Sequence, residues 1–414
     1  MQKRLQKAAR LALGIATLGG IGLVGAFGAG TAGAAPTFGP GGSPVIGHVY
    51  LDDNTTGTNT ISGFDRHLDG SLTPLAGSPF VAGGAGTGAA GGLASQGAIA
   101  VTNDGQFLIA VDAGSNQLSV LRINFNGSLQ LVPNGVVSSD GYTPVSVAVH
   151  DGLVYAANAA TGANVPNPTT VEPNYTGFTL SPFGQLQPLA NSTVSLPNGS
   201  QPGDVLFNST GTNLVGTRVG TSLIDSFSVG RNGLLTEAAG APFSAQGLGP
   251  FGSEFRPTNP QQLFVSNAHN VGTTTDPLPG TVSAFNVAFN GSLTSIGASP
   301  VADDQAGTCW VAITPDGRYL FAVNTGTGYI STYQIAPNGS LTFITSTEVS
   351  NTAGVGATDA SVSPDGRTLY VNESRVGTVG AFAISNGGTL TELPSSPVAV
   401  PGGAHPAGIV TTGL

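Results

Sequence analysis

The sequence predicts an all-β fold, a seven-bladed β-propeller of four-stranded antiparallel blades. The first observation is a turn motif, Asn-Gly-Ser-Leu or a degenerate copy, that recurs seven times with its glycines 57, 57, 49, 58, 48 and 49 residues apart. The second is the strand pattern inside each repeat, and the third is an incomplete repeat at each end. A period near fifty residues with a hairpin turn in each unit is typical of a propeller. The motif glycines are Gly70, Gly127, Gly184, Gly233, Gly291, Gly339 and Gly388.

Each repeat contains four short segments that suit β-strands. In the clearest copy we expect strands over 311–314, 319–324, 329–335 and 341–345, separated by turns with the sequences Pro-Asp-Gly and Pro-Asn-Gly. These turns form because glycine accepts positive φ, proline fixes φ before it, and Asn or Asp can bond its own backbone. Four antiparallel strands then make one blade.

The two ends of the chain complement each other. His405 to Val410 resembles the first strand of a repeat, but the chain stops at Leu414 before a second strand can follow. Val45 to Asp52 resembles a second strand with no first strand before it. We therefore expect the C-terminal strand to pair into the N-terminal blade, which closes the ring and leaves no open sheet edge.

The first 35 residues have the features of a secretory signal peptide. Four basic residues precede an apolar run over 11–29, and Ala-Gly-Ala-Ala at 32–35 offers a cleavage site. This predicts a signal peptide over 1–35, a propeller domain over 36–414 and a secreted or cell-surface location. The alternative is that the run persists as a membrane anchor, although it lies at the short end of the ~20 residues needed to span a bilayer.

The charge of the remaining chain limits its partners. Without the signal peptide it keeps eight arginines and no lysine against 22 acidic residues, a net charge of −14. No basic patch exists to release counterions from phosphates, so we expect no nucleic-acid partner. The ligand-spacing patterns of metal sites and the glycine motifs of nucleotide sites are also missing, which predicts no metal and no cofactor. Cys309 is the only cysteine, and we expect a small buried side chain without reactivity.

Strand direction sorts the connections onto two faces of the disc. Connections between first and second strands and between third and fourth strands are tight. The other connections share the opposite, loop-rich face and contain all the length variation: Gly83 to Gln96, Ala159 to Tyr175, Ala268 to Gly280 and Ala298 to Thr308. Long loops on one face of a rigid scaffold usually carry binding, although drift in tolerant loops would look the same.

These motifs resemble those of the lactonase group of seven-bladed propellers, which includes the propeller type of six-phosphogluconolactonase and a carboxymuconate-lactonizing enzyme. The resemblance rests on Arg318 to Asn324 after a Pro-Asp-Gly turn, on Arg367 to Glu373 after another, and on the Asn-Gly-Ser-Leu turns. It implies histidine and arginine around the central channel, introduced by a His-Pro-x-His entry. Here only His405-Pro406 echoes that entry. The aligned channel column contains no histidine: Ala98, Ser146, Asp204, Gly252, Trp310, Asp359 and Gly408.

Polar residues near the channel supply the candidates for chemistry. A lactone hydrolase needs a base to activate water and donors for the oxyanion. Asp359, Glu373 and Arg375 can supply these if they converge in one blade, although a strand-end ion pair would explain them equally well. We expect Asp204 and Asp359 on opposite walls of the channel, because they lie three blades apart. The candidate ligand-binding residues are Asp204, Glu254, Arg256 and Trp310.

The sequence thus supports two functions. The favoured one is an exported, monomeric binding or scaffold protein that takes a small molecule or a protein at the loop-rich face and channel mouth. The missing histidines favour this reading. The alternative is a hydrolase that acts on a small lactone through carboxylate-activated water.

Overall fold

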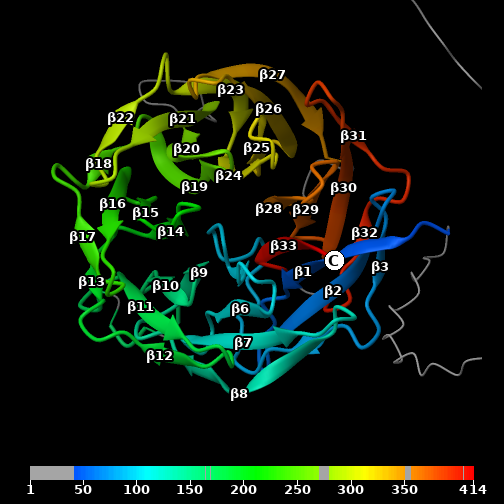
Figure 1. Ribbon diagram of the computed structural model, residues 1–414, viewed down its shortest axis with the longest axis horizontal. Coiled ribbons are helices and arrows are strands. Elements are labelled where there is room, and N and C mark those ends of the chain that lie inside the picture. The colour runs from blue at the N-terminus through cyan, green and yellow to red at the C-terminus, as the bar shows by residue number, and fades with distance from the viewer. Residues whose placement is uncertain (1–41, 164, 168, 270–278, 350–355, 404) are drawn as a thin grey trace, which may run out of the picture. The chain divides into compact units, whose positions relative to one another are not determined.

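The protein is a ring of seven β-sheets around a central axis (Figure 1). The computed structural model describes residues 42–414 except 164, 168, 270–278, 350–355 and 404. All regular elements in these ranges are strands, so the predicted all-β, seven-bladed fold is confirmed. The predicted signal peptide, residues 1–35, lies outside the described residues. The described chain includes no helix that could cross a membrane.

The strands of each blade are given from the channel outward. Blade 1 consists of β33 (Gly408–Gly413), β1 (Val45–Asp52), β2 (Thr60–His67), β3 (Leu72–Pro74) and β4 (Phe80–Val81). Blade 2 consists of β5 (Ile99–Val101), β6 (Phe107–Asp112), β7 (Gln117–Ile123) and β8 (Leu129–Ser138). Blade 3 consists of β9 (Pro144–His150), β10 (Leu153–Asn158), β11 (Asn174–Leu180), β12 (Leu186–Pro188) and β13 (Val194–Ser195). Blade 4 consists of β14 (Pro202–Phe207), β15 (Asn213–Arg218), β16 (Leu223–Val229), β17 (Leu235–Glu237) and β18 (Phe243–Ser244).

The remaining blades follow the same order. Blade 5 consists of β19 (Leu248–Arg256), β20 (Asn259–His269), β21 (Pro279–Val287), β22 (Leu293–Ser295) and β23 (Val301–Ala306). Blade 6 consists of β24 (Thr308–Ile313), β25 (Tyr319–Asn324), β26 (Tyr329–Ile335) and β27 (Leu341–Glu348). Blade 7 consists of β28 (Ala357–Val362), β29 (Thr368–Glu373), β30 (Thr378–Ile384), β31 (Leu390–Glu392) and β32 (Val398–Ala399).

Blade 1 is assembled from both ends of the chain, as the sequence predicts. Strand β33 pairs antiparallel with β1 in continuous register from Gly47 opposite Gly413 to Asp52 opposite Gly408. The last strand is therefore the innermost strand of the first blade. This pairing closes the ring without a free edge at the junction.

The outermost strand is broken in five blades, a detail that the sequence prediction does not contain. In blade 1, for example, β3 and β4 both pair with β2. At the break, a serine hydroxyl accepts a hydrogen bond from the backbone amide that has lost its strand partner. Ser78 Oγ lies 2.9 Å from the Gly63 amide nitrogen, and Ser396 Oγ lies 2.9 Å from the Ala381 amide nitrogen. The proline that follows each of these serines has no N–H for a sheet hydrogen bond, so pairing stops there.

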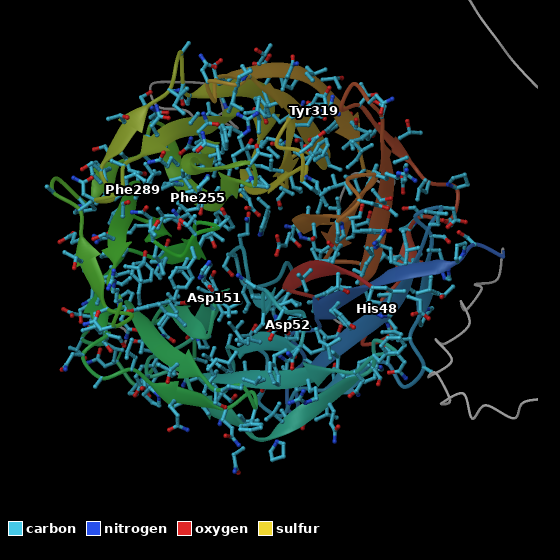
Figure 2. The ribbon with its side chains drawn as sticks, viewed as in Figure 1. His48, Asp52, Asp151, Phe255, Phe289 and Tyr319 are labelled. Carbon is cyan, nitrogen blue, oxygen red and sulfur yellow. The ribbon has the colours of Figure 1, made fainter. Side chains whose placement is uncertain are left out.

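The Asn-Gly turns join neighbouring blades on the tight-turn face. The hydroxyl of Tyr50 in blade 1 donates to the carbonyl oxygen of Gly127 in blade 2 at 2.7 Å. The hydroxyl of Tyr319, labelled in Figure 2, donates to the Asn386 carbonyl oxygen of the next blade at 2.9 Å. The motif glycines all have positive φ, here 77° at Gly127, which explains why the motif is glycine in every repeat.

Candidate functional site

Within the described residues, two long connections and several short ones build the loop-rich face. The longest connects β4 to β5, and the second, over 159–173, connects β10 to β11. The expectation of a long loop over Ala298 to Thr308 is wrong, because most of it folds as β23 and pairs with β21. The residues 270–278, which make up most of another expected loop, lie outside the described residues.

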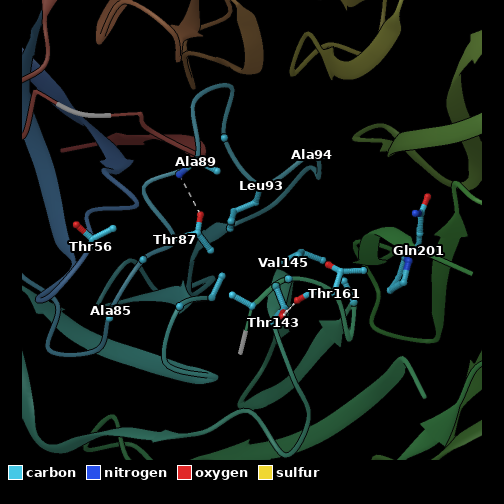
Figure 3. Close-up of a pocket in the computed structure, with 18 of the residues that line it drawn as sticks. Thr56, Ala85, Thr87, Ala89, Leu93, Ala94, Thr143, Val145, Thr161 and Gln201 are labelled. Carbon is cyan, nitrogen blue, oxygen red and sulfur yellow. Dashed lines mark hydrogen bonds between the residues drawn. The ribbon is translucent and has the colours of Figure 1, made fainter. Parts of the chain in front are cut away.

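These connections surround a hollow of about 750 Å³ over blades 1 to 5 (Figure 3). This volume is within the ordinary range of small-molecule sites. The apolar part of its lining includes Leu93, Val145, Val219 and Phe251, and the polar part consists of threonines and Gln201. The residues that line it are Thr56, Gly57, Ala85, Gly86, Thr87, Ala89, Gly92, Leu93, Ala94, Ala113, Gly114, Thr143, Val145, Ala159, Thr161, Gly162, Ala163, Gln201, Pro202, Val219 and Phe251.

The hollow has no ionisable side chain in its lining. Asp, Glu, His, Cys, Lys, Arg and Tyr are all missing from the set, so within the described residues no lining group can act as a general acid or base at neutral pH. Among its polar side chains, the Gln201 carboxamide and the Thr161 hydroxyl have no hydrogen-bond partner in the described part of the chain. The hollow therefore suits an uncharged molecule with few polar groups.

Strained backbone is concentrated around this hollow. Twelve described residues other than glycine have positive φ, and seven of these are Asn or Asp, which tolerate that conformation. Of the remaining five, three line the hollow: Ala94 (φ 52°), Thr143 (φ 54°) and Gln201 (φ 48°). Thr143 is β-branched and Gln201 precedes a proline, and both features disfavour this region further. Such strain is typical of functional sites.

The floor of the hollow is a plug formed by Leu93 to Gly97, which fills the channel mouth. The carboxamide of Gln96 donates from Nε2 to the Ser253 carbonyl oxygen in blade 5 at 3.0 Å, and its Oε1 accepts the Val311 amide of blade 6 at 2.9 Å. The Gln96 amide donates to the carbonyl oxygen of Gly203 in blade 4 at 2.9 Å.

The plug also contacts the other walls of the channel. Ser95 Oγ donates to the carbonyl oxygen of Val145 in blade 3 at 2.7 Å. The Gly97 amide is hydrogen-bonded to Asp359 in blade 7. A Cβ on Gly252 would lie 2.0 Å from Gln96 Oε1, so glycine at this channel position makes room for the plug.

The acidic residues of the channel lie against this plug, outside the lining of the hollow. Asp204 is 2 % exposed and bridges three blades: its Oδ1 accepts from Ser146 Oγ at 3.2 Å, and its Oδ2 accepts from Ser253 Oγ at 2.6 Å. Asp359 is 4 % exposed and accepts the Ala360 amide at 2.9 Å. Glu254 is partly buried and forms no hydrogen bond with the described residues.

Burial and mutual repulsion raise the pKa values of these carboxyl groups. Burial raises the pKa of Asp204 to about 7 although hydrogen bonds from Ser253 and Ser146 lower it. Burial raises the pKa of Asp359 to about 7, although the hydrogen bonds that it accepts from backbone amides lower it. Burial also raises the pKa of Glu254 to about 8, and the negative charges of Asp204 and Asp359 add to the shift. The three groups are therefore coupled electrostatically, even though Asp204 and Asp359 come from blades 4 and 7.

The residues of the predicted catalytic set have different partners. Asp359 contacts the channel strands, whereas Glu373 accepts a hydrogen bond from Thr378 on the neighbouring strand β30. Arg375 is exposed, and among the described residues it forms no ion pair. No hydrogen bond or ion pair within the described residues joins these three side chains, although β28 and β29 are paired, so their joint role stays a prediction.

The remaining two candidates, Arg256 and Trp310, lie in different surroundings. Arg256 donates to the Gly317 carbonyl oxygen at 2.8 Å and to Gln262 Oε1 at 2.9 Å, which joins blade 5 to a tight turn of blade 6. Its position on the tight-turn face is far along the strand from the hollow. Trp310 packs against Phe251 with ring centroids 4.9 Å apart, and Phe251 lines the hollow. Trp310 therefore adjoins the hollow through this contact.

Comparison with known proteins agrees with this architecture. The family model described as Lactonase, 7-bladed beta-propeller matches residues 258–412. The chain is a seven-bladed β-propeller that resembles the lactonase family over residues 258–412. No curated protein sequence matches it significantly.

Solved structures share the fold of this lactonase-like propeller at low sequence identity. The putative 6-phosphogluconolactonase of Bacteroides uniformis is 19% identical with a TM-score of 0.69, and the match covers 89% of this chain and 99% of that one. The periplasmic gluconolactonase of Pseudomonas aeruginosa is 18% identical with a TM-score of 0.65, and the match covers 89% and 99% of the two chains. At this level of identity the likeness establishes the fold alone.

The plug of this lactonase-like propeller was not predicted from the sequence. One signal in the sequence is the length of the connection over 83–96, which by itself predicts a surface loop. The glycine at position 252 is a second signal in the sequence. A channel position without a side chain indicates that another group occupies the space. Burial raises the pKa of the Cys309 thiol to about 12, which is consistent with the expected lack of reactivity.

Proposed function

We propose that this lactonase-like propeller is an extracytoplasmic binding protein that holds a small uncharged molecule in the hollow of its loop-rich face. The observation that carries the proposal is the separation of the hollow from the acidic groups. The hollow has no ionisable lining residue, and the plug of Leu93 to Gly97 lies between it and the carboxyl groups of the channel. The cluster of strained residues around the hollow supports a functional role.

The location outside the cytoplasm rests on the N-terminal sequence. Basic residues, an apolar run and small residues at 32–35 are the three parts of a secretory signal peptide. The solved propeller from Pseudomonas aeruginosa that shares this fold is named a periplasmic gluconolactonase. We propose that the protein acts as a monomer, without a cofactor, and that its net charge of −14 after export keeps it from nucleic acid.

Hydrolysis of a small lactone is the second candidate. It is favoured by the raised pKa values of Asp204, Asp359 and Glu254, because a carboxyl group with a pKa near 7 can exchange a proton at neutral pH. This reaction requires the plug to leave the channel mouth. Substrate in the hollow would otherwise not reach any of these groups.

Calorimetric titration with simple γ- and δ-lactones tests the binding function. We expect heat of binding without turnover in the native protein. Ala89 is exposed and lines the hollow, so Ala89→Phe should fill the space and abolish binding while the melting temperature stays unchanged. A failure of every neutral ligand to bind would refute the proposal.

A hydrolysis assay with the same lactones separates the two candidates. Gly252→Ala places a methyl group where Gln96 lies, and this should displace the plug without altering any carboxyl group. We expect no turnover by the native protein or by this variant. Turnover that Gly252→Ala increases and that Asp359→Asn abolishes, with Glu373→Gln as the control, would establish the hydrolase instead.

A further inference from the structure

The sequence Asn-Gly-Ser occurs four times in the chain, in two structural settings. The asparagines of these copies are Asn126, Asn198, Asn290 and Asn338. Three of them belong to hairpin turns between the third and fourth strands of a blade, whereas Asn198 lies in the connection from β13 to β14. Because the four tripeptides are identical, any difference in their reactivity is set by the fold.

An asparagine that precedes glycine can lose its side-chain amide without an enzyme. The backbone nitrogen of the glycine attacks the carbonyl carbon of the asparagine side chain, the new C–N bond closes an imide ring, and the side-chain nitrogen leaves as ammonia. Water then opens the imide to aspartate or isoaspartate, so water is the only co-reactant. Glycine favours ring closure because it has no Cβ to hinder it. The glycine nitrogen must be free of hydrogen bonds and must lose its proton to a base.

The glycine nitrogen is occupied in the three hairpin turns. The Gly127 amide donates to the Asn124 carbonyl oxygen at 2.9 Å. The equivalent bonds of Gly291 and Gly339 measure 2.8 and 2.9 Å. All three glycines are buried, and a Cβ on Gly127 would lie 2.4 Å from the ring of His48 in the neighbouring blade. Ring closure at these positions therefore requires the turn to open first.

The asparagine side chain is also held in these turns. Asn126 Oδ1 accepts a hydrogen bond from the Ser128 amide at 3.2 Å. Asn338 Oδ1 accepts the same bond from the Ser340 amide at 3.1 Å, and the third turn repeats it at 3.1 Å. Each carboxamide is thus bonded to the amide of the serine and not to that of the glycine.

Asn198 and Gly199 lack these restraints. Among the described residues, the Gly199 amide has no hydrogen-bond acceptor. Gly199 is exposed, and a Cβ built on it would meet no atom within 4 Å. The Ser200 amide donates to the Pro197 carbonyl oxygen at 3.1 Å and leaves the Asn198 side chain unbonded on this side. That side chain donates from Nδ2 to the Thr169 carbonyl oxygen at 2.9 Å, and its Oδ1 accepts no bond from the described part of the chain.

The Asn-Gly pairs at 134–135, 232–233 and 386–387 are restrained in other ways. Gly135 is buried. The Gly233 amide donates to a backbone carbonyl oxygen at 2.8 Å, and the Gly387 amide donates to Ser385 Oγ at 3.2 Å. Within the described residues, Asn198 therefore combines a free glycine nitrogen with open space around it.

We propose that Asn198 is the asparagine at which this protein deamidates first, through attack by the free Gly199 amide. The product at position 198 is aspartate or isoaspartate, and one ammonia is released for each water consumed. This inference stands on the geometry of the loop and does not depend on the proposed binding function.

The modification changes the charge of the loop-rich face. Asn198 and Gly199 line a side pocket of about 320 Å³, which shares part of its lining with the hollow, including Gln201. Within the described residues, neither lining contains an ionisable side chain, so the new carboxylate is the first charge at either space. An aged molecule therefore has a negatively charged rim where a fresh one is neutral.

The four identical tripeptides serve as controls for one another. The native protein is incubated in mildly alkaline buffer made with heavy-oxygen water, digested with pepsin in acid and analysed by mass spectrometry. The heavy oxygen marks sites that reacted during incubation, because the new carboxyl oxygen comes from water. We expect Asn198 to deamidate at least about tenfold faster than any hairpin copy, since attack in a hairpin must first break a hydrogen bond. In protein unfolded with guanidinium chloride, the four rates should be similar.

Two variants assign the fast reaction to its residue. Glutamine closes the larger imide ring far more slowly, so Asn198→Gln should remove the early acidic species seen by isoelectric focusing. Asn338→Gln is the matched control and should leave that species unchanged, and melting temperatures check that both variants fold. The inference is overturned if a hairpin copy reacts as fast as Asn198 in the folded protein, or if Asn198→Gln retains the early acidic species. No ligand is involved in these measurements, so neither outcome bears on the proposed binding function.

Discussion

The indole Nε1 of Trp310 in blade 6 donates a hydrogen bond to the carbonyl oxygen of Ser95 at 2.7 Å, although the two residues lie 215 positions apart in the chain. Ser95 precedes the innermost strand of blade 2, so this bond crosses the ring. Together with the two bonds of the Gln96 carboxamide, it makes the plug a link between blades on opposite sides of the channel. The plug is therefore part of the fold as well as the floor of the hollow.

Gln96→Ala should destabilise the protein. The substitution leaves the Ser253 carbonyl oxygen and the Val311 amide buried without their partner, and each such loss costs about 1–3 kcal/mol. Urea denaturation monitored by circular dichroism measures the change in the free energy of unfolding. Gln106→Ala is the matched control, because Gln106 belongs to the same blade but is exposed. Equal stability of the two variants would show that the plug does not support the ring.

Removal of the last strand should prevent cooperative folding. A chain that ends at Pro401 lacks β33. The edge of β1 is then exposed, and Asp359 loses the hydrogen bond that it accepts from the Ile409 amide. We expect a loss of the sharp thermal transition, because an open ring leaves two unpaired edges. Deletion of Leu414 alone, which is 76 % exposed, should have no effect. A normal melting temperature for the shorter chain would contradict the role of β33 in closure.

Stability should fall as the pH rises from about 5 to 9. The folded-state pKa values of Asp204 and Asp359 are about 7 and that of Glu254 is about 8, all above the value of about 4 for an unfolded carboxyl group. A raised folded-state pKa gives stability that is fully present below pH 4 and is lost as the pH passes 7 to 8.

Melting temperatures across this range measure the effect. Glu254→Gln removes one of the three groups. The free energy of unfolding should then fall less steeply with pH, by an amount that corresponds to at most one bound proton. A profile that is flat, or that rises toward pH 9, would contradict the raised pKa values.

Two alanines of one loop should respond to glycine in opposite ways. Ala94 has φ of 52°, where a side chain costs about 1 kcal/mol, so Ala94→Gly should leave the free energy of unfolding unchanged or raise it by up to about 1 kcal/mol. Ala89 is also exposed and lacks positive φ, so Ala89→Gly should lower stability by about 0.5–1 kcal/mol through added freedom of the unfolded chain. Chemical denaturation of both variants compares them directly. Equal losses would show that the backbone at Ala94 is not strained.

Much of the fold was accessible from the sequence because it depends on local patterns. The glycines of the Asn-Gly turns need positive φ, and the strands alternate between them, so repeats such as 311–345 could be divided into strands without coordinates. The closure of the ring followed from counting strands, since His405 to Val410 and Val45 to Asp52 complete one blade. The break in the outer strands was missed because the hydrogen bonds that compensate for it, from Gly63 to Ser78 and from Ala381 to Ser396, join residues 15 positions apart and leave no mark on the local turn pattern.

The site was decided by tertiary structure. The blades, the loop-rich face and the acidic residues of the channel column could be predicted from the sequence, because each of these follows from position within a repeat. Only the folded ring decided that Gln96 would enter the channel, that Asp204 and Asp359 would lie behind it, and that Gln201 would border an uncharged hollow. A single repeat specifies the contacts of its own strands, whereas the channel is formed by side chains from all seven blades. Its occupant therefore depends on distances around the ring that no local pattern encodes.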